Sequence, residues 1–158
     1  MTEKEFLEKL KKGVTRFYES RDGLLLNRAL NINERSVTHK LAMFLTPLFS
    51  NYDVDCEYNR MIGHEGTRME GDLFVKKLGL GPITTTGEDD DGTTVYPDII
   101  IHKRNQPINI AVIEVKMKWK NGKKDFDYRK LDAYKKDLKY VFAVYLELDE
   151  KKYSIEFR

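Results

Sequence analysis

The chain has 158 residues, of which 41% are hydrophobic and 34% are charged, and its formal net charge is +2; this length and balance fit one folded domain and exclude an intrinsically disordered chain. No apolar run approaches the roughly 20 residues that a membrane-spanning helix needs, and residues 1–5 lack the apolar stretch of a secretory signal. A single cysteine, Cys56, excludes a disulfide framework, so we expect a cytoplasmic protein with Cys56 in its core rather than in catalysis.

The first 32 residues are expected to form a helical N-terminal extension. Thr2 and Glu5 have the spacing of a capping box. Apolar residues then recur at helical intervals, at Phe6, Leu10, Val14 and Phe17. A second helix is predicted over residues 34–48, with Asn31 or Asn33 as its N-cap.

Glu34, in the first turn of this second helix, falls within the arc of the helix's apolar residues. That arc contains Val37, Leu41, Phe44, Leu45 and Leu48. A carboxylate that faces the core needs a partner, because an unpaired buried charge is costly. The sequence leaves two roles open for Glu34: a cap at the positive end of the helix, or a ligand to a metal ion.

The next segment predicts one strand and a long insertion. Residues 54–58 alternate between apolar and polar side chains, as in a half-buried strand. The glycine-rich residues 61–94 predict a loop-rich insertion with a short element near residues 73–78, and a loop of this length is usually functional or mobile. The acidic residues 88–91 either hold a metal or form a solvated run.

Two strongly apolar segments, 96–102 and 108–117, predict neighbouring strands joined by a turn. Alternation places Glu114 and Lys116 on the same face of their strand, and pairing as a hairpin brings Asp98 close to both. Two carboxylates can hold a hard divalent cation, and a lysine can position or deprotonate a water that attacks a phosphodiester. The residues therefore favour a metal-dependent nuclease, although polar strand ends can also simply mark the approach to solvent.

The remaining residues predict one helix and two strands. The helix starts with Asp125 or Asp127 as its cap and reaches about residue 138. Its expected packing positions are Phe126, Leu131, Tyr134 and Leu138. Strands follow at 140–148 and, on the sheet edge, at 151–157. This order predicts an α/β fold, a mixed β-sheet flanked by helices, in a single domain over residues 1–158.

The charged residues are unevenly distributed. Residues 116–139 contain ten lysines and arginines but only four aspartates. A basic zone beside carboxylates suits a polyanion handled through a metal, and a solvated lysine-rich helix is the other interpretation. The residues expected to contact phosphates are Lys118, Lys120, Lys123 and Lys124.

Pro97 with Asp98, followed by Glu114, Val115 and Lys116, resembles the signature of the PD-(D/E)XK nuclease superfamily. The apolar strands that carry these residues and the helix that follows them match its pattern. The resemblance implies a restriction-endonuclease-like fold, with its mixed sheet and flanking helices over residues 33–148.

The resemblance also implies the roles of individual residues. Asp98, Glu114 and the Val115 carbonyl would bind Mg²⁺ or Mn²⁺, and Glu34 would complete or tune the site. Lys116 would position or activate the water and stabilise the charge that develops on the phosphate.

On the later helix, Lys130 and Tyr134 have the spacing of a Gln-x-x-x-Tyr motif of some branches of the superfamily, with lysine replacing glutamine. They extend the expected nucleic-acid contacts. The implied substrate is DNA, and a homodimer would supply two sites for two strands. One alternative is a non-catalytic nucleic-acid-binding or assembly module that retains the fold. Another is an RNA-directed or nucleotide-activated nuclease.

Three further polar side chains each have two interpretations. His102 either touches the substrate or is a surface residue at a strand end. Arg60 either holds a phosphate or forms a salt bridge, and Trp119 either stacks on a base or anchors the next turn. The histidines, at 39, 64 and 102, do not have the spacing of a zinc finger.

Overall fold

The computed structural model describes residues 1–58, 60–61, 74–75, 77–78, 93–94, 96–120 and 124–158. At its centre is a five-stranded sheet whose strands, in spatial order, are β1 (Asp53–Cys56), β6 (Ile99–Lys103), β7 (Ile108–Met117), β8 (Phe142–Leu148) and β9 (Tyr153–Phe157). β7 and β8 run parallel, and the other neighbours are antiparallel. The predicted mixed sheet, the β6–β7 hairpin and the edge position of β9 are confirmed.

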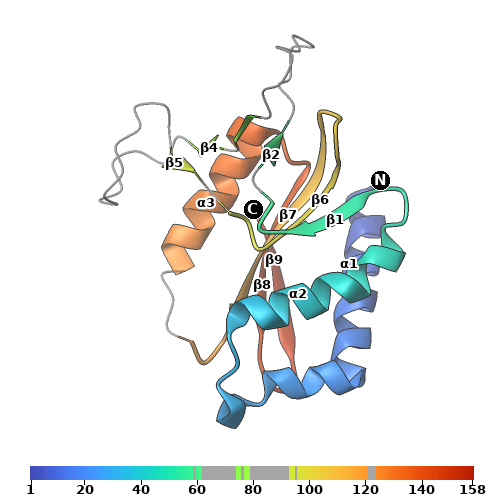
Figure 1. The fold of residues 1–158 in the computed structure, drawn as a ribbon, viewed down its shortest axis with the longest axis vertical. Helices are drawn as coiled ribbons and strands as arrows, with labels where there is room; N and C mark the ends of the chain where they lie inside the picture. Colours follow the sequence, from blue (N-terminus) through green and yellow to red (C-terminus); the bar gives the residue numbers. More distant parts are fainter. Residues whose placement is uncertain (59, 62–73, 76, 79–92, 95, 121–123) are drawn as a thin grey trace.

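Helices cover both faces of the sheet (Figure 1). The α-helices in the described residues are α1 (Glu3–Glu19), α2 (Glu34–Leu45) and α3 (Lys124–Leu138). α1 and α2 pack with Ile113 and Val115 on one face, whereas Leu131 and Tyr134 of α3 pack with Val112 on the other. β7 is therefore buried on both faces, which explains its nearly continuous apolar sequence.

The remaining described elements are short. Three 3₁₀ helices span Arg21–Leu26, Arg28–Leu30 and Thr46–Leu48. Within the predicted insertion, β2 (Arg60–Met61) pairs with β3 (Phe74–Val75), and β4 (Lys77–Leu78) pairs with β5 (Thr93–Thr94). The acidic run at 88–91 lies outside the described residues.

α1 has the predicted capping box between Thr2 and Glu5, and its inward face belongs to the main hydrophobic core. Its inward residues Phe6, Leu10, Val14 and Phe17 are all fully buried. Gly13 lies where α1 meets α2, and a Cβ built on it would be 2.4 Å from Leu45 Cδ2. Close helix contact therefore accounts for a glycine in the middle of α1.

Two helix boundaries differ from the prediction. α2 ends at Leu45 rather than at residue 48 and continues as a 3₁₀ turn, because Pro47 has no N–H and its ring clashes with the preceding turn. α3 begins at Lys124, so Asp125 and Asp127 lie inside its first turn, and the prediction that one of them is the cap was wrong. In the part of the chain that the structure describes, no helix is both long and apolar enough to cross a membrane.

Candidate active site

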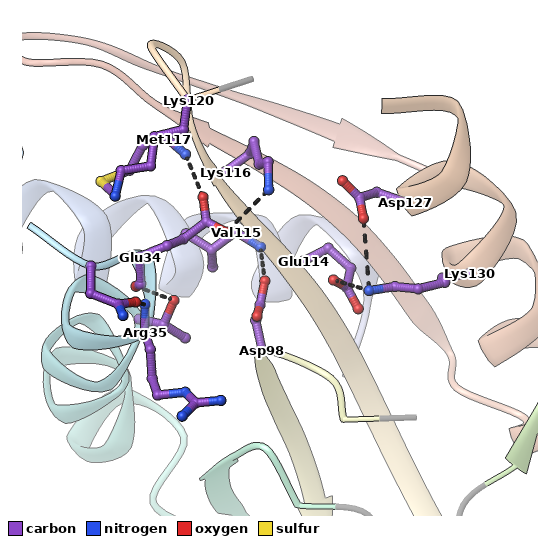
Figure 2. A network of polar contacts seen from close by, with 12 residues as sticks. Glu34, Arg35, Asp98, Glu114, Val115, Lys116, Met117, Lys120, Asp127 and Lys130 are labelled. Atoms are coloured by element: carbon purple, nitrogen blue, oxygen red, sulfur yellow. Dashed lines mark hydrogen bonds and ion pairs between the residues drawn. The ribbon is translucent and has the colours of Figure 1, made fainter. Parts of the chain in front are cut away.

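The candidate site lies where β6 and β7 separate. Their described pairing stops at Ile99 and Ile113, while β7 continues to Met117 alongside β8. Asp98 Oδ2 accepts a hydrogen bond from the Val115 N–H (N···O 2.8 Å), and Glu34 Oε2 accepts one from the Met117 N–H (3.1 Å). Two carboxylates thus bind backbone groups on the side of β7 that β6 has left (Figure 2).

Glu34 reaches this place from the first turn of α2. The side chain of Asn33 caps the helix, accepting from the Arg35 N–H at 2.9 Å, so the capping role considered for Glu34 belongs to Asn33. Glu34 Oε1 instead receives a hydrogen bond from Lys116 Nζ at 3.1 Å. Glu34 therefore connects the backbone of β7 with the lysine of the predicted signature, and its inward orientation is confirmed.

Glu114 lies deeper, on the face of the sheet covered by α3. Its side chain is 5% exposed, and its Oε2 lies 2.7 Å from Lys130 Nζ. Its Oε1 is buried without a hydrogen-bond partner among the described residues. Burial raises the pKa of Glu114 to about 8, repulsion from Asp98 adds to this effect, and the attraction of Lys130 offsets only part of it.

The pKa of Asp98 is also raised. Burial raises its pKa to about 6, although the hydrogen bond from Val115 and the charge of Lys130 act in the opposite direction. Two neighbouring carboxyl groups with raised pKa values form an environment that disfavours two negative charges. A cation placed between them would relieve this cost.

The donor atoms at this place suit a hard divalent cation. Asp98 and Glu114 offer carboxylate oxygens, one of which, Glu114 Oε1, has no hydrogen-bond partner in the described part of the chain. The N–H and C=O of a residue leave an extended strand on the same side, so the Val115 carbonyl shares the open side of β7 with its N–H. Among the described residues, no three His, Cys, Asp or Glu side chains converge as a ready cluster. The protein ligands would therefore be two carboxylates and one carbonyl, with water completing the shell.

A polar pocket of about 350 Å³ adjoins the site between α2 and the ends of β1 and β6. Glu34 and Asp98 both line it. Its other lining residues are Asn33, Arg35, Thr38, His39 and Glu57. The two carboxylates therefore border a space that solvent and a substrate can enter.

The lysines that are expected to contact phosphates have different partners in the structure. Lys118 lies 3.8 Å from Asp149, and Lys124 lies 2.8 Å from Glu156; both lysines are exposed. Lys120 Nζ donates to the Ile32 carbonyl at 2.6 Å. Lys123 lies outside the described residues.

Lys130 and Tyr134 have different environments in this structure. The Tyr134 side chain is fully buried between α3 and the sheet, so its predicted contact with nucleic acid is corrected to a packing role. The Lys130 side chain is 16% exposed and paired with Glu114, and its predicted contact with nucleic acid stays a prediction. The sequence already indicated that Tyr134 is a packing position, because the apolar residues Leu131 and Leu138 lie at helical spacing from it.

A second buried polar cluster was missed from the sequence. His102 is 4% exposed, and its Nε2 lies 2.8 Å from Asp55 Oδ2, so it is neither a surface residue nor an available substrate contact. Arg104 Nε also donates to Asp55 Oδ2 at 2.8 Å. Burial opposes the charge of Asp55, but the hydrogen bonds from His102 and Arg104 outweigh it and lower the Asp55 pKa to about 2. The alternation of residues 53–57 was the available signal, since it places Asp55 on the face that His102 shares.

The environments of Cys56 and Trp119 can be compared with the roles predicted for them. Cys56 is half-buried, and its pKa is raised to about 12 by burial, which agrees with a packing role rather than a nucleophilic one. Trp119 packs against the core beside α1 and α2, with Arg28 over its ring, as expected of an anchor for the turn after β7. The side chain of Arg60 is not among those described.

No protein-family model, curated protein or solved structure matches this chain.

Proposed function

We propose that this protein is a divalent-metal-dependent nuclease that hydrolyses phosphodiester bonds in DNA, and that its sheet is the core of a restriction-endonuclease-like fold. One observation carries the proposal: Asp98, immediately before β6, and Glu114, in β7, have raised pKa values at the point where the two strands separate, and the charge of Lys116 acts on Asp98. A stability role does not explain two acids whose surroundings disfavour their charges.

Asp98, Glu114 and the Val115 carbonyl are the groups that would hold Mg²⁺ or Mn²⁺. When bound, the cation supplies a Lewis acid for a phosphoryl oxygen and lowers the pKa of a bound water. The protein contributes the placement of the donors. The Val115 N–H fixes the orientation of the Asp98 carboxylate, and Val115 directly follows Glu114 in β7.

Lys116 provides a compact positive charge at the border of the site. Its side chain is 22% exposed and is held by Glu34, which in turn is held by the Met117 N–H. In this role Lys116 stabilises the negative charge that develops on the phosphate and positions the attacking water. Glu34 then acts as a positioning residue for Lys116.

The basic character of the chain after β7 supports a nucleic-acid substrate. The side chains of Lys118 and Lys124 are 47% and 44% exposed. They belong to the zone in which positive residues outnumber negative ones ten to four. Contacts of this kind bind the sugar–phosphate backbone without reading the sequence.

A non-catalytic nucleic-acid-binding module is the second candidate, and one observation favours it. Glu114 already has a protein counter-ion, Lys130, and the described residues do not present three converging acidic or histidine ligands. In such a module the two acids would be neutralised by the protein itself and would serve packing.

A cleavage assay separates the two candidates. Supercoiled, linear and branched DNA and single-stranded RNA are incubated with the protein in Mg²⁺, in Mn²⁺ and in EDTA. We expect metal-dependent cleavage by the wild type, its loss in Lys116→Met, and its retention in Lys136→Met, a control at an exposed position of α3. Salt-dependent DNA binding without any cleavage, or full cleavage by Lys116→Met, would refute the catalytic proposal.

A further inference from the structure

Lys130 is an unusual neighbour for a metal-binding carboxylate. It extends from α3 towards β7, and its side chain is only 16% exposed where it meets Glu114 Oε2. Burial works against its charge, but Glu114 outweighs this and raises the Lys130 pKa. Lys130 is therefore a positive charge, supplied by the protein itself, that already neutralises a carboxylate that the metal ion would need as a ligand.

The ion pair with Lys130 engages one of the two carboxylate oxygens of Glu114. Oε2 is bonded to Lys130, whereas Oε1 is buried and has no hydrogen-bond partner among the residues that the structure describes. The Tyr134 hydroxyl, in the same core, is also buried without a hydrogen-bond partner in the part of the chain that the structure describes. Buried carboxylate oxygens are normally satisfied, so a free one indicates a place that a further ligand completes.

A second position for Lys130 already exists. Asp127, one turn earlier on α3, has its Oδ1 3.7 Å from Lys130 Nζ, compared with 2.7 Å for Glu114 Oε2. Figure 2 shows the ammonium group between the two carboxylates. A small change in the lysine side chain would exchange the close partner for the distant one.

We infer that Lys130 is an internal counter-ion that occupies Glu114 in the cation-free protein and moves to Asp127 when a divalent cation binds Glu114. Two cations held against one buried carboxylate repel each other strongly, so metal entry and the Lys130–Glu114 pair compete. Lys130 then weakens metal binding, and Asp127 favours it by receiving the displaced lysine. This inference rests on the proposed metal site but adds a competitor and a receiving position to it.

The test measures Mn²⁺ affinity directly, by calorimetry, without any substrate. Lys130→Gln keeps a hydrogen-bond donor for Glu114 but removes the charge, and we expect it to bind Mn²⁺ about tenfold more tightly than the wild type. Asp127→Asn should bind several-fold more weakly. Lys136→Gln, on the exposed side of the same helix, should bind as the wild type does.

A double variant identifies the route by which Asp127 acts. If Asp127 works by receiving Lys130, Asp127→Asn should have little effect on Mn²⁺ affinity when Lys130→Gln is already present. Equal effects in both backgrounds would mean that Asp127 acts on the metal independently and would overturn the two-position mechanism. A crystal soaked with Mn²⁺ should show Lys130 Nζ closer to Asp127 than to Glu114.

The outcomes separate this inference from the proposed function. Identical Mn²⁺ affinities for the wild type and Lys130→Gln, with binding lost in Asp98→Asn, would overturn the role of Lys130 and leave the metal site in place. No Mn²⁺ binding by either the wild type or Lys130→Gln would overturn both. Circular dichroism checks that each variant is folded, and if Lys130→Gln does not fold, the weaker affinity expected of Asp127→Asn tests the inference.

Discussion

Two groups of carboxylates beside strand β6 are in opposite situations. In the first group, Asp55 of the neighbouring strand is bonded by His102 and Arg104, and its pKa is lowered to about 2. In the second group, Asp98 and Glu114 have pKa values raised to about 6 and about 8. The first group is completed by its protein neighbours. The second has charges that its neighbours only partly compensate.

This difference separates an acid that stabilises the fold from the two acids for which we propose a function. Folding favours the ionised form of Asp55, so the Asp55 cluster stabilises the protein. Folding disfavours the ionised forms of Asp98 and Glu114, so they cost stability unless something outside the chain joins them. Burial alone therefore does not identify a functional carboxylate; the balance of its partners does.

The largest expected effect is on cleavage. Asp98→Asn or Glu114→Gln should lower the rate of metal-dependent DNA cleavage by about 10³-fold or more, because each removes a donor worth several kcal/mol of transition-state stabilisation. Asp55→Asn should retain cleavage per folded molecule. Single-turnover rates with saturating Mg²⁺ measure this, and an equal loss in Asp55→Asn would erase the distinction between the two clusters.

The next effect is on thermal stability. A divalent cation at about 100 times its dissociation constant should stabilise the wild type by about 2.7 kcal/mol, because it binds only the folded state. Asp55→Asn should start from a lower Tm and show the same increase with Mn²⁺, whereas Asp98→Asn should show none. Differential scanning fluorimetry with and without Mn²⁺ gives the comparison, and a similar rise in Asp98→Asn would place the bound metal elsewhere.

Removing Asp55 tests the structural cluster itself. Asp55→Ala should lower the free energy of unfolding by about 2 kcal/mol at pH 7, since charged hydrogen bonds to a buried partner are lost. Because folding lowers the Asp55 pKa, its contribution is present above the unfolded value near 4 and is lost as the pH falls towards 2. Urea unfolding at pH 7 and near pH 2.5 measures this. The exposed pair of Asp132 with Arg158 is the control, and Asp132→Ala should cost less than about 1 kcal/mol.

The smallest effect has the opposite sign. Folding raises the Glu114 pKa to about 8, so its contribution is most favourable below about pH 4.5 and is lost as the pH rises towards 8. Without metal, Glu114→Gln should therefore gain stability relative to the wild type between pH 5.5 and pH 8.5. Unfolding curves at these two pH values decide it; a constant difference would show that Glu114 is fully compensated by Lys130.

Local patterns predicted much of the fold and part of the site. The strand alternation of residues 108–117 placed Val112 and Ile113 on opposite faces, as the structure has them, because side-chain direction in a strand depends on position. Helical phase likewise turned Glu34 inward. These are properties of single elements. The roles proposed for these residues stay predictions.

Contacts between elements were less accessible from the sequence. The Lys130–Glu114 pair depends on how α3 is rotated against β7, and the Asp55–His102 pair depends on the register of β1 with β6. Neither rotation nor register is encoded in a short motif. Lys130 was therefore predicted only as a nucleic-acid contact, and the structure pairs it with the buried Glu114.

The separation of β6 from β7 has a consequence for self-association. A strand edge with free backbone N–H groups is a template onto which a strand from another molecule can add. Asp98 and Glu34 occupy the N–H groups of Val115 and Met117 on that side of β7. The same two carboxylates that border the candidate site thus also block the addition of a foreign strand at the opening in the sheet.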